Sequence, residues 1–141
     1  MRILIVEDEP LIALLVADVL TDGGHEVAGV ASNFASACER AERARPDLAL
    51  VDIQLAGGDS GIDVARALRA LGVPSILVSS DGCSARGNRD AAVGYLAKPW
   101  RPDALLESID AAAVILHGEP PSCVPADFEM FRYARPVAFA A

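Results

Sequence analysis

Short apolar runs alternate with amphipathic stretches from the N-terminus to about residue 117, and this alternation constrains the fold more than any other feature. The five apolar runs cover residues 3–6, 27–30, 48–51, 73–78 and 93–97. Runs of this length predict buried strands, whereas the stretches between them place apolar side chains at helical spacing. Repeated units of a strand followed by a helix pack as a parallel sheet covered by helices. The sequence therefore predicts an α/β domain.

Proline or glycine bounds each predicted helix, and these helices cover residues 10–21, 34–45, 62–71 and 102–116. The connection between the fourth and fifth apolar runs differs from the others. It contains Gly82, Gly87 and Asn88, which are poor helix formers. We therefore expect the fourth helix to be short, frayed or absent.

The last part of the chain changes character. Residues 1–118 are predicted to form the domain, and residues 119–141 a proline-rich tail. Four of the seven aromatic residues fall in this tail, namely Phe128, Phe131, Tyr133 and Phe139. Because disordered segments seldom carry so many aromatic side chains, we expect the tail to dock on the domain, on a second copy or on a partner.

Charge and hydropathy exclude several classes of protein. Twelve basic residues against twenty acidic ones give a formal net charge of −8, the wrong sign for binding nucleic-acid phosphates or anionic lipid. The segment Glu7-Asp8-Glu9-Pro10 interrupts the apolar N-terminus, so neither an export signal nor a membrane span is predicted. Three cysteines without a CxxC pair predict no disulfide framework. We expect a cytoplasmic protein that binds neither nucleic acid nor membranes directly.

Polar side chains follow four of the five predicted strands. They are Glu7 and Asp8 after the first, Asp52 after the third, Ser79 after the fourth and Lys98 after the fifth. Parallel strands deliver their carboxyl ends to one edge of the sheet, where α/β proteins bind ligands. Each residue alone fits a simpler role, such as a turn or a helix start. Independent surface residues would not, however, place these chemical types after four separate strands.

The chemistry of this set favours phosphoryl transfer. Carboxylates a few ångströms apart repel by about 4 kcal/mol per pair at a protein-like dielectric, which a divalent cation would compensate. Oxygen ligands favour Mg²⁺, with Mn²⁺ as the alternative. A carboxylate can act as a nucleophile toward phosphorus, and Lys98, the only lysine in the chain, supplies a compact charge for a phosphate oxygen.

The sequence resembles the receiver domain of two-component response regulators over residues 1 to about 117. The matching segments are Ile3-Leu4-Ile5-Val6-Glu7-Asp8-Glu9-Pro10, Leu50-Val51-Asp52-Ile53, Val73-Pro74-Ser75-Ile76-Leu77-Val78-Ser79-Ser80 and Gly94-Tyr95-Leu96-Ala97-Lys98-Pro99. The resemblance implies a flavodoxin-like, doubly wound sheet of five parallel strands in the order 2-1-3-4-5.

The resemblance also implies roles for individual residues. Asp52 resembles the phosphoryl acceptor, and Asp8 and the backbone carbonyl of Gln54 would join it in holding Mg²⁺, with Glu7 acting through metal-bound water. Lys98 would pair with the phosphoryl group.

Further implied roles concern switching and hydrolysis. Ser79 resembles the switch hydroxyl, and Tyr95 the aromatic side chain whose inward or outward position reports the state. Gln54 and Asp81 occupy the two positions that tune hydrolysis of the acyl phosphate. The bond between Lys98 and Pro99 resembles one that is cis in the family. Two departures stand out: the short fourth connection, and Glu7 in place of the more usual Asp.

The leading hypothesis is a single-domain response regulator, not a turnover enzyme. It would receive a phosphoryl group from a histidine kinase or a phosphotransfer protein and then bind a downstream protein, with homodimerisation also open. One alternative is a phosphatase of the haloacid dehalogenase type, although Pro10 stands where such enzymes carry a second Asp. Another is a pseudo-receiver that binds partners without phosphorylation.

Overall fold

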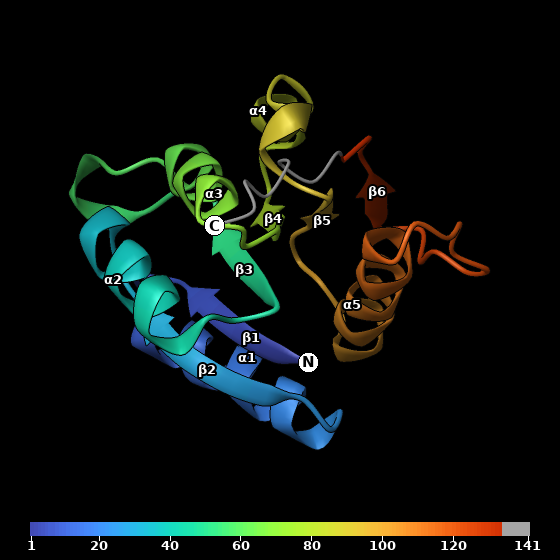
Figure 1. Ribbon diagram of the computed structural model, residues 1–141, viewed down its shortest axis with the longest axis horizontal. Helices are drawn as coiled ribbons and strands as arrows, with labels where there is room; N and C mark the ends of the chain where they lie inside the picture. The colour runs from blue at the N-terminus through green and yellow to red at the C-terminus, as the bar shows by residue number, and fades with distance from the viewer. Residues whose placement is uncertain (134–141) are drawn as a thin grey trace, which may run out of the picture.

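The computed structural model describes residues 1–133, which form a six-stranded sheet flanked by helices (Figure 1). The strand order is β2-β1-β3-β4-β5-β6, and the first five strands are parallel. The strands are β1 (Arg2–Val6), β2 (Glu26–Ala31), β3 (Leu48–Asp52), β4 (Ser75–Ser79), β5 (Gly94–Ala97) and β6 (Phe128–Met130). The predicted order of the five parallel strands is confirmed.

The helices lie close to their predicted positions. They are α1 (Pro10–Asp22), α2 (Phe34–Ala44), α3 (Gly61–Ala70), α4 (Gly82–Arg86) and α5 (Pro102–Leu116), with short 3-10 helices η1 (Ala56–Gly58) and η2 (Arg89–Ala91). Proline at the start of α1 and α5 and an asparagine cap at the start of α2 account for three of these boundaries.

Both faces of the sheet are buried, and alternate residues of each strand face opposite sides. In β1, Leu4 and Val6 pack with residues of α2 and α3, whereas Ile3 and Ile5 pack with residues of α1 and α5. This two-sided burial explains why the strands are continuous apolar runs. It also fixes the carboxyl ends of the parallel strands at one edge.

The fourth helix is short, as predicted. It contains five residues, and Gly87 follows it directly. The Asp81 side chain caps its start by accepting a hydrogen bond from the Ser84 amide (3.1 Å). The connection then continues through η2 to β5.

The sixth strand is a feature that no pattern in the sequence predicts. Residues of the tail pair antiparallel with β5, placing Tyr95 opposite Glu129 (Figure 1). Phe128 and Phe131 are each 5% exposed, so docking of the tail on its own domain is confirmed for these residues. Phe139 lies outside the described residues. Within residues 1–133, no helix is both long and apolar enough to cross a membrane.

Candidate functional site

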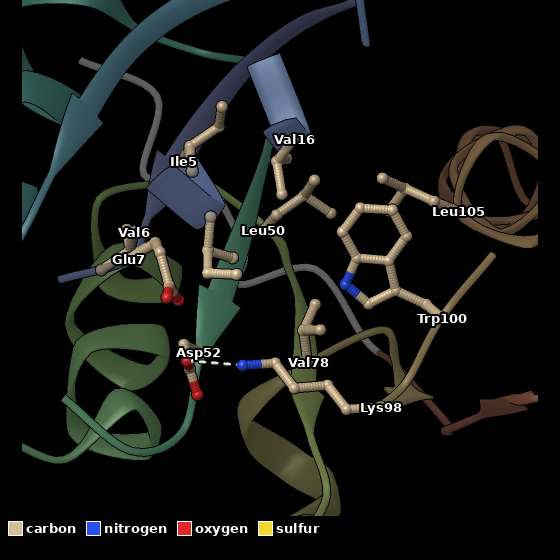
Figure 2. A pocket seen from close by; sticks show the side chains of 11 residues that line it. Ile5, Val6, Glu7, Val16, Leu50, Asp52, Val78, Lys98, Trp100 and Leu105 are labelled. Carbon is tan, nitrogen blue, oxygen red and sulfur yellow. Dashed lines mark hydrogen bonds and ion pairs between the residues drawn. The ribbon is translucent and has the colours of Figure 1, made fainter. Parts of the chain in front are cut away.

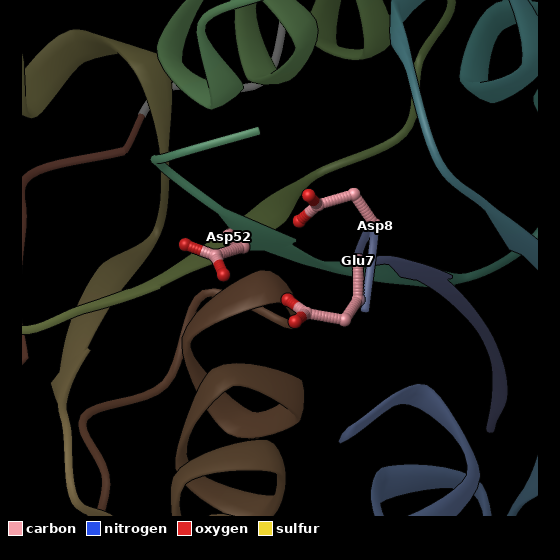
Figure 3. Close-up of side chains that lie close together, drawn as sticks. All are labelled: Glu7, Asp8 and Asp52. Atoms are coloured by element: carbon pink, nitrogen blue, oxygen red, sulfur yellow. The ribbon is translucent and has the colours of Figure 1, made fainter. Parts of the chain in front are cut away.

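Three carboxylates converge where β1 and β3 end (Figure 3). Glu7 and Asp8 follow β1, and Asp52 is the last residue of β3. One oxygen from each side chain lies within 4.8 Å of the others. Such a group of hard oxygen donors has the chemistry of a site for Mg²⁺ or another small divalent cation.

Within this acidic group, Asp52 also contacts Lys98, the only lysine in the chain (Figure 2). Lys98 Nζ donates to Asp52 Oδ2 at 2.8 Å, and the Gln54 amide donates to Asp52 Oδ1 at 3.0 Å. The Asp52 side chain is only 10% exposed. Both oxygens therefore have donors, and the carboxylate is held in a fixed orientation.

The pKa of Glu7 is raised by the burial of its side chain and by its neighbour Asp52. It is raised from 4.5 to about 8, most of all by burial, and the hydrogen bond to Asp52 and the negative charge of Asp52 act in the same direction. The Lys98 ammonium lowers it, but less strongly. Without a cation, Glu7 therefore keeps a proton near neutral pH.

Asp8 is tied to the loop that follows Asp52. Its Oδ2 accepts a hydrogen bond from the Ala56 amide at 3.0 Å. This contact joins the first and third strand ends across a separation of 48 residues. The bond thus fixes the position of the loop relative to Asp8.

Gly61 brings the start of α3 against the backbone of Asp52, a contact that sequence reasoning missed. A Cβ atom at this position would lie 1.8 Å from the Asp52 carbonyl oxygen. The Gly61 amide donates to the Ile53 carbonyl at 2.8 Å, which closes the loop. The only signal in the sequence is a glycine directly after the capping residue Ser60.

Ser79, Tyr95 and Asp81 form a second group at the end of β4. The Tyr95 hydroxyl donates to the Ser79 carbonyl at 2.8 Å, and the Asp81 amide donates to Ser79 Oγ at 2.9 Å. Tyr95 is 4% exposed, and burial raises the pKa of its hydroxyl. The ring therefore occupies the inward position in this structure.

Asp81 faces α4 more than the acidic group. Its carboxylate accepts hydrogen bonds from the Ser84 hydroxyl (2.6 Å) and the Ser84 amide, and these bonds lower its pKa. Gln54 is exposed and lies in the loop after Asp52. The peptide bond between Lys98 and Pro99 is cis, as the resemblance implied.

The predicted site residues thus divide into two neighbouring groups. Glu7, Asp8, Asp52 and Lys98 are linked by direct contacts or close approach, and the Lys98 amide connects them to Ser79 by donating to its carbonyl (3.0 Å).

Trp100 follows the end of β5 and contributes to the surroundings of the site. It lines a small apolar cavity beneath Asp52 and Lys98, together with Val16 and Leu105 (Figure 2). The floor of the site is therefore apolar, which keeps the Asp52 carboxylate and the Lys98 ammonium away from bulk water on that side.

The family model for the response regulator receiver domain matches residues 3–110 of this sequence. The chain belongs to this family. Among curated relatives of this receiver domain, the transcriptional regulatory protein PdtaR of Mycobacterium tuberculosis is 34% identical, covering 79% of this chain and 56% of the relative. The phyllosphere-induced regulator PhyR of Methylorubrum extorquens is 41% identical, covering 72% of this chain and 39% of the relative.

A solved structure of a receiver domain is also similar to this chain. The signal receiver domain of a modulated diguanylate cyclase from Desulfovibrio desulfuricans is 39% identical to this chain and superposes with a TM-score of 0.71. The match covers 79% of this chain and 91% of that one. By contrast, this chain spans only about half of PdtaR and less of PhyR. The relatives share the receiver domain with this chain, and parts of their sequences lie beyond it.

Proposed function

We propose that this receiver domain accepts a phosphoryl group on the carboxylate of Asp52. The observation that carries the proposal is the position of Asp52, between two further carboxylates and the Lys98 ammonium. Asp52 is a fixed nucleophile with carboxylates on one side and an ammonium on the other. This arrangement suits phosphoryl transfer, in which the negative charges of the nucleophile and the phosphoryl group must come together and be neutralised.

The transfer is a substitution at phosphorus. An Asp52 oxygen forms a bond to phosphorus as the bond from phosphorus to one imidazole nitrogen of a phosphohistidine breaks. The ring carries a proton on its other nitrogen when the transfer begins, so it keeps the electron pair of the broken bond and leaves as neutral imidazole. Lys98 Nζ, now on Asp52 Oδ2, would then pair with a phosphoryl oxygen. The phosphohistidine belongs to a histidine kinase or a histidine phosphotransfer protein.

Glu7, Asp8 and Asp52 would hold Mg²⁺, with the Gln54 carbonyl as a further ligand, and Mn²⁺ would fit the same donors. A cation held there would supply positive charge to offset the charge that accumulates around the phosphoryl oxygens. A cation bound there would compete with the proton that Glu7 holds near neutral pH, because both bind the same oxygens.

The second group of residues would report the transfer. Ser79 directly follows Val78, which pairs with Asp52 across β3 and β4, and we propose that its hydroxyl turns toward a phosphoryl group on Asp52. That turn ends the hydrogen bond from the Asp81 amide to Ser79 Oγ and alters the surroundings of Tyr95. Gln54 and Asp81 are proposed to set the rate at which water hydrolyses the acyl phosphate. The outcome is binding of a downstream protein, not catalytic turnover.

The phosphodonor is proposed to dock on an apolar surface beside Asp52. Leu11 and Leu15 on α1 are 75% and 50% exposed. Next to them lies a groove of about 450 Å³, lined by Leu15, Pro99 and Trp100 among others. Exposed apolar area of this kind marks a protein interaction site. Lys98, which contacts Asp52, lines the same groove, so a donor docked there would lie beside the Asp52 carboxylate.

The experiment that tests the proposal is phosphorylation by a small donor. The chain is incubated with Mg²⁺ and acetyl phosphate, and its intact mass is measured. We expect a gain of one phosphoryl group that is absent in Asp52→Asn and present in the matched control Asp22→Asn, an exposed acid on α1. No gain in the folded protein, or a gain that survives in Asp52→Asn, contradicts the proposal.

A further inference from the structure

β6 completes the sheet at a position where β5 would otherwise be an edge. Two backbone hydrogen bonds flank the paired residues, from the Ala97 amide to the Asp127 carbonyl (3.1 Å) and from the Phe131 amide to the Val93 carbonyl (2.8 Å). Unpaired strand edges are templates that accept a strand from another chain. The tail therefore covers a surface that has the chemistry of a strand-docking site.

β5 is shaped for the strand that covers it. A Cβ atom on Gly94 would lie 2.5 Å from Phe128 Cζ and 2.6 Å from the Glu129 carbonyl oxygen. Gly94 has no positive φ, so its backbone conformation does not require glycine. The missing side chain instead makes a notch that the Phe128 ring fills.

Arginines surround the same edge in a chain of net charge −8. Glu129 accepts from Arg86 Nε at 2.8 Å and from Arg89 Nη2 at 3.5 Å. The Arg89 guanidinium lies 5.6 Å from the centre of the Phe131 ring, and that of Arg69 lies 5.3 Å from the centre of the Tyr133 ring. The edge of β5 and its neighbouring arginines thus bind one acidic side chain that lies between aromatic side chains.

The covering strand is weakly built compared with the others. It has three residues, and the segment that leads to it from α5 is largely exposed and contains Pro120, Pro121 and Pro125. Its main anchors are the two buried rings and one acidic side chain. Opening such a segment costs less than opening a core strand.

We propose that the edge of β5, with Gly94, Arg86 and Arg89, is a docking site for an extended segment of a partner protein, and that residues 127–133 occupy it as a displaceable internal ligand. The partner segment carries an acidic residue flanked by aromatic residues and adds to β5 as an antiparallel strand. This inference goes beyond phosphoryl transfer, and its test uses the unphosphorylated full chain.

The test opens the site by reversing one charge. Glu129→Arg places a third cation beside Arg86 and Arg89 and weakens the covering strand, while Glu119→Arg makes the same charge change in the exposed linker. We expect faster hydrogen exchange of the Ala97 amide in Glu129→Arg, and an unchanged rate in Glu119→Arg. Adding Arg86→Glu to Glu129→Arg should restore part of the protection.

The probe for the partner is a labelled peptide with the sequence of residues 125–133. In fluorescence polarisation, Glu129→Arg should bind it about tenfold or more tightly than the wild type, because the internal segment competes at an effective concentration on the order of millimolar. A peptide with Phe128→Ala and Glu129→Lys should bind neither protein. Equal affinity for both proteins, no binding to Glu129→Arg, or unchanged exchange at Ala97 overturns the proposal.

Two further measurements distinguish displacement of the strand from unfolding and from self-association. If the Glu129→Arg variant does not fold, the wild type is tested with added peptide instead. Millimolar peptide must then accelerate hydrogen exchange of the Phe131 amide. No acceleration rejects the displacement of residues 127–133 by the peptide. Light scattering with and without peptide measures self-association. A dimer of the full chain that the peptide dissociates would assign the edge to a second copy and overturn a separate partner.

Discussion

At the scale of single residues, the site is governed by charge that the fold brings too close together. Glu7, Asp8 and Asp52 each place an oxygen within 4.8 Å of the others, with Lys98 as the nearest cation among the described contacts. Burial raises the pKa of Glu7 most, and the hydrogen bond to Asp52 and the negative charge of Asp52 raise it further. Between about pH 4.5 and pH 8, Glu7 in the folded chain therefore holds a proton that the unfolded chain has already released.

This difference predicts how stability changes with pH. The Glu7 contribution is fully present below pH 4.5 and is lost as the pH rises through about 8, because the native state binds the extra proton. Glu7→Gln should remove this loss, so its free energy of unfolding should exceed that of the wild type at about pH 8.5 without divalent cations. Urea unfolding in EDTA at about pH 5 and pH 8.5 measures the effect. An equal pH dependence in both proteins contradicts it.

Gly61 gives a second prediction at this scale. Gly61→Ala would force its Cβ against the Asp52 carbonyl, so we expect a loss of about 3 kcal/mol in stability and slower phosphorylation of Asp52. The matched control is Gly82→Ala, whose Cβ would meet only the flexible end of Arg86. That control should change stability by about 1 kcal/mol or less. Urea unfolding and a mass-based rate assay measure the two effects.

At the scale of elements, β6 shows how a short strand is stabilised by neighbours far away in the chain. Its three residues have little tendency to form a strand alone, yet β5 supplies backbone partners. The two faces of the sheet bury the ring of Phe128 and that of Phe131, the residue that follows the strand. Phe128 belongs to the core on the side of α1 and α5, and Phe131 to the core on the side of α2 and α3. The strand therefore seals both cores at this end of the sheet.

Burial of the Phe128 ring sets the expected cost of removing it. Phe128→Ala should lower the free energy of unfolding by about 3 kcal/mol, because it loses buried area and leaves a space over Gly94. Met130→Ala, in the same strand but 42% exposed, should change it by about 0.5 kcal/mol or less. Equal losses in thermal or urea unfolding would show that the ring is not an anchor.

At the scale of the whole molecule, a series of hydrogen bonds and the short helix α4 link the acidic group to β6. Ser79 contacts Lys98 on one side and both Tyr95 and Asp81 on the other. Asp81 caps α4, and Arg86 at the end of α4 holds Glu129 of β6. The acidic pocket and the strand on β5 are thus physically connected through short elements.

Ligand binding at the pocket should stabilise the whole domain. With Mg²⁺ at about 100 times its dissociation constant, the gain is about 2.7 kcal/mol. We expect this gain in thermal unfolding of the wild type and of Asp22→Asn, and its loss in Asp8→Asn. A gain of the same size in Asp8→Asn would place the cation elsewhere.

The sequence by itself determined the five parallel strands, four of the helices and the short fourth one, because alternation, helical spacing and helix-stopping residues are local signals. It also determined that Glu7, Asp8, Asp52 and Lys98 lie together, since each lies at the end of a strand of one parallel sheet. Only the tertiary structure decided the contact of Gly61 with Asp52, the raised pKa of Glu7 and the pairing of β6 with β5. Each of these depends on distances between segments that the fold brings together, and no local pattern of residues encodes such distances.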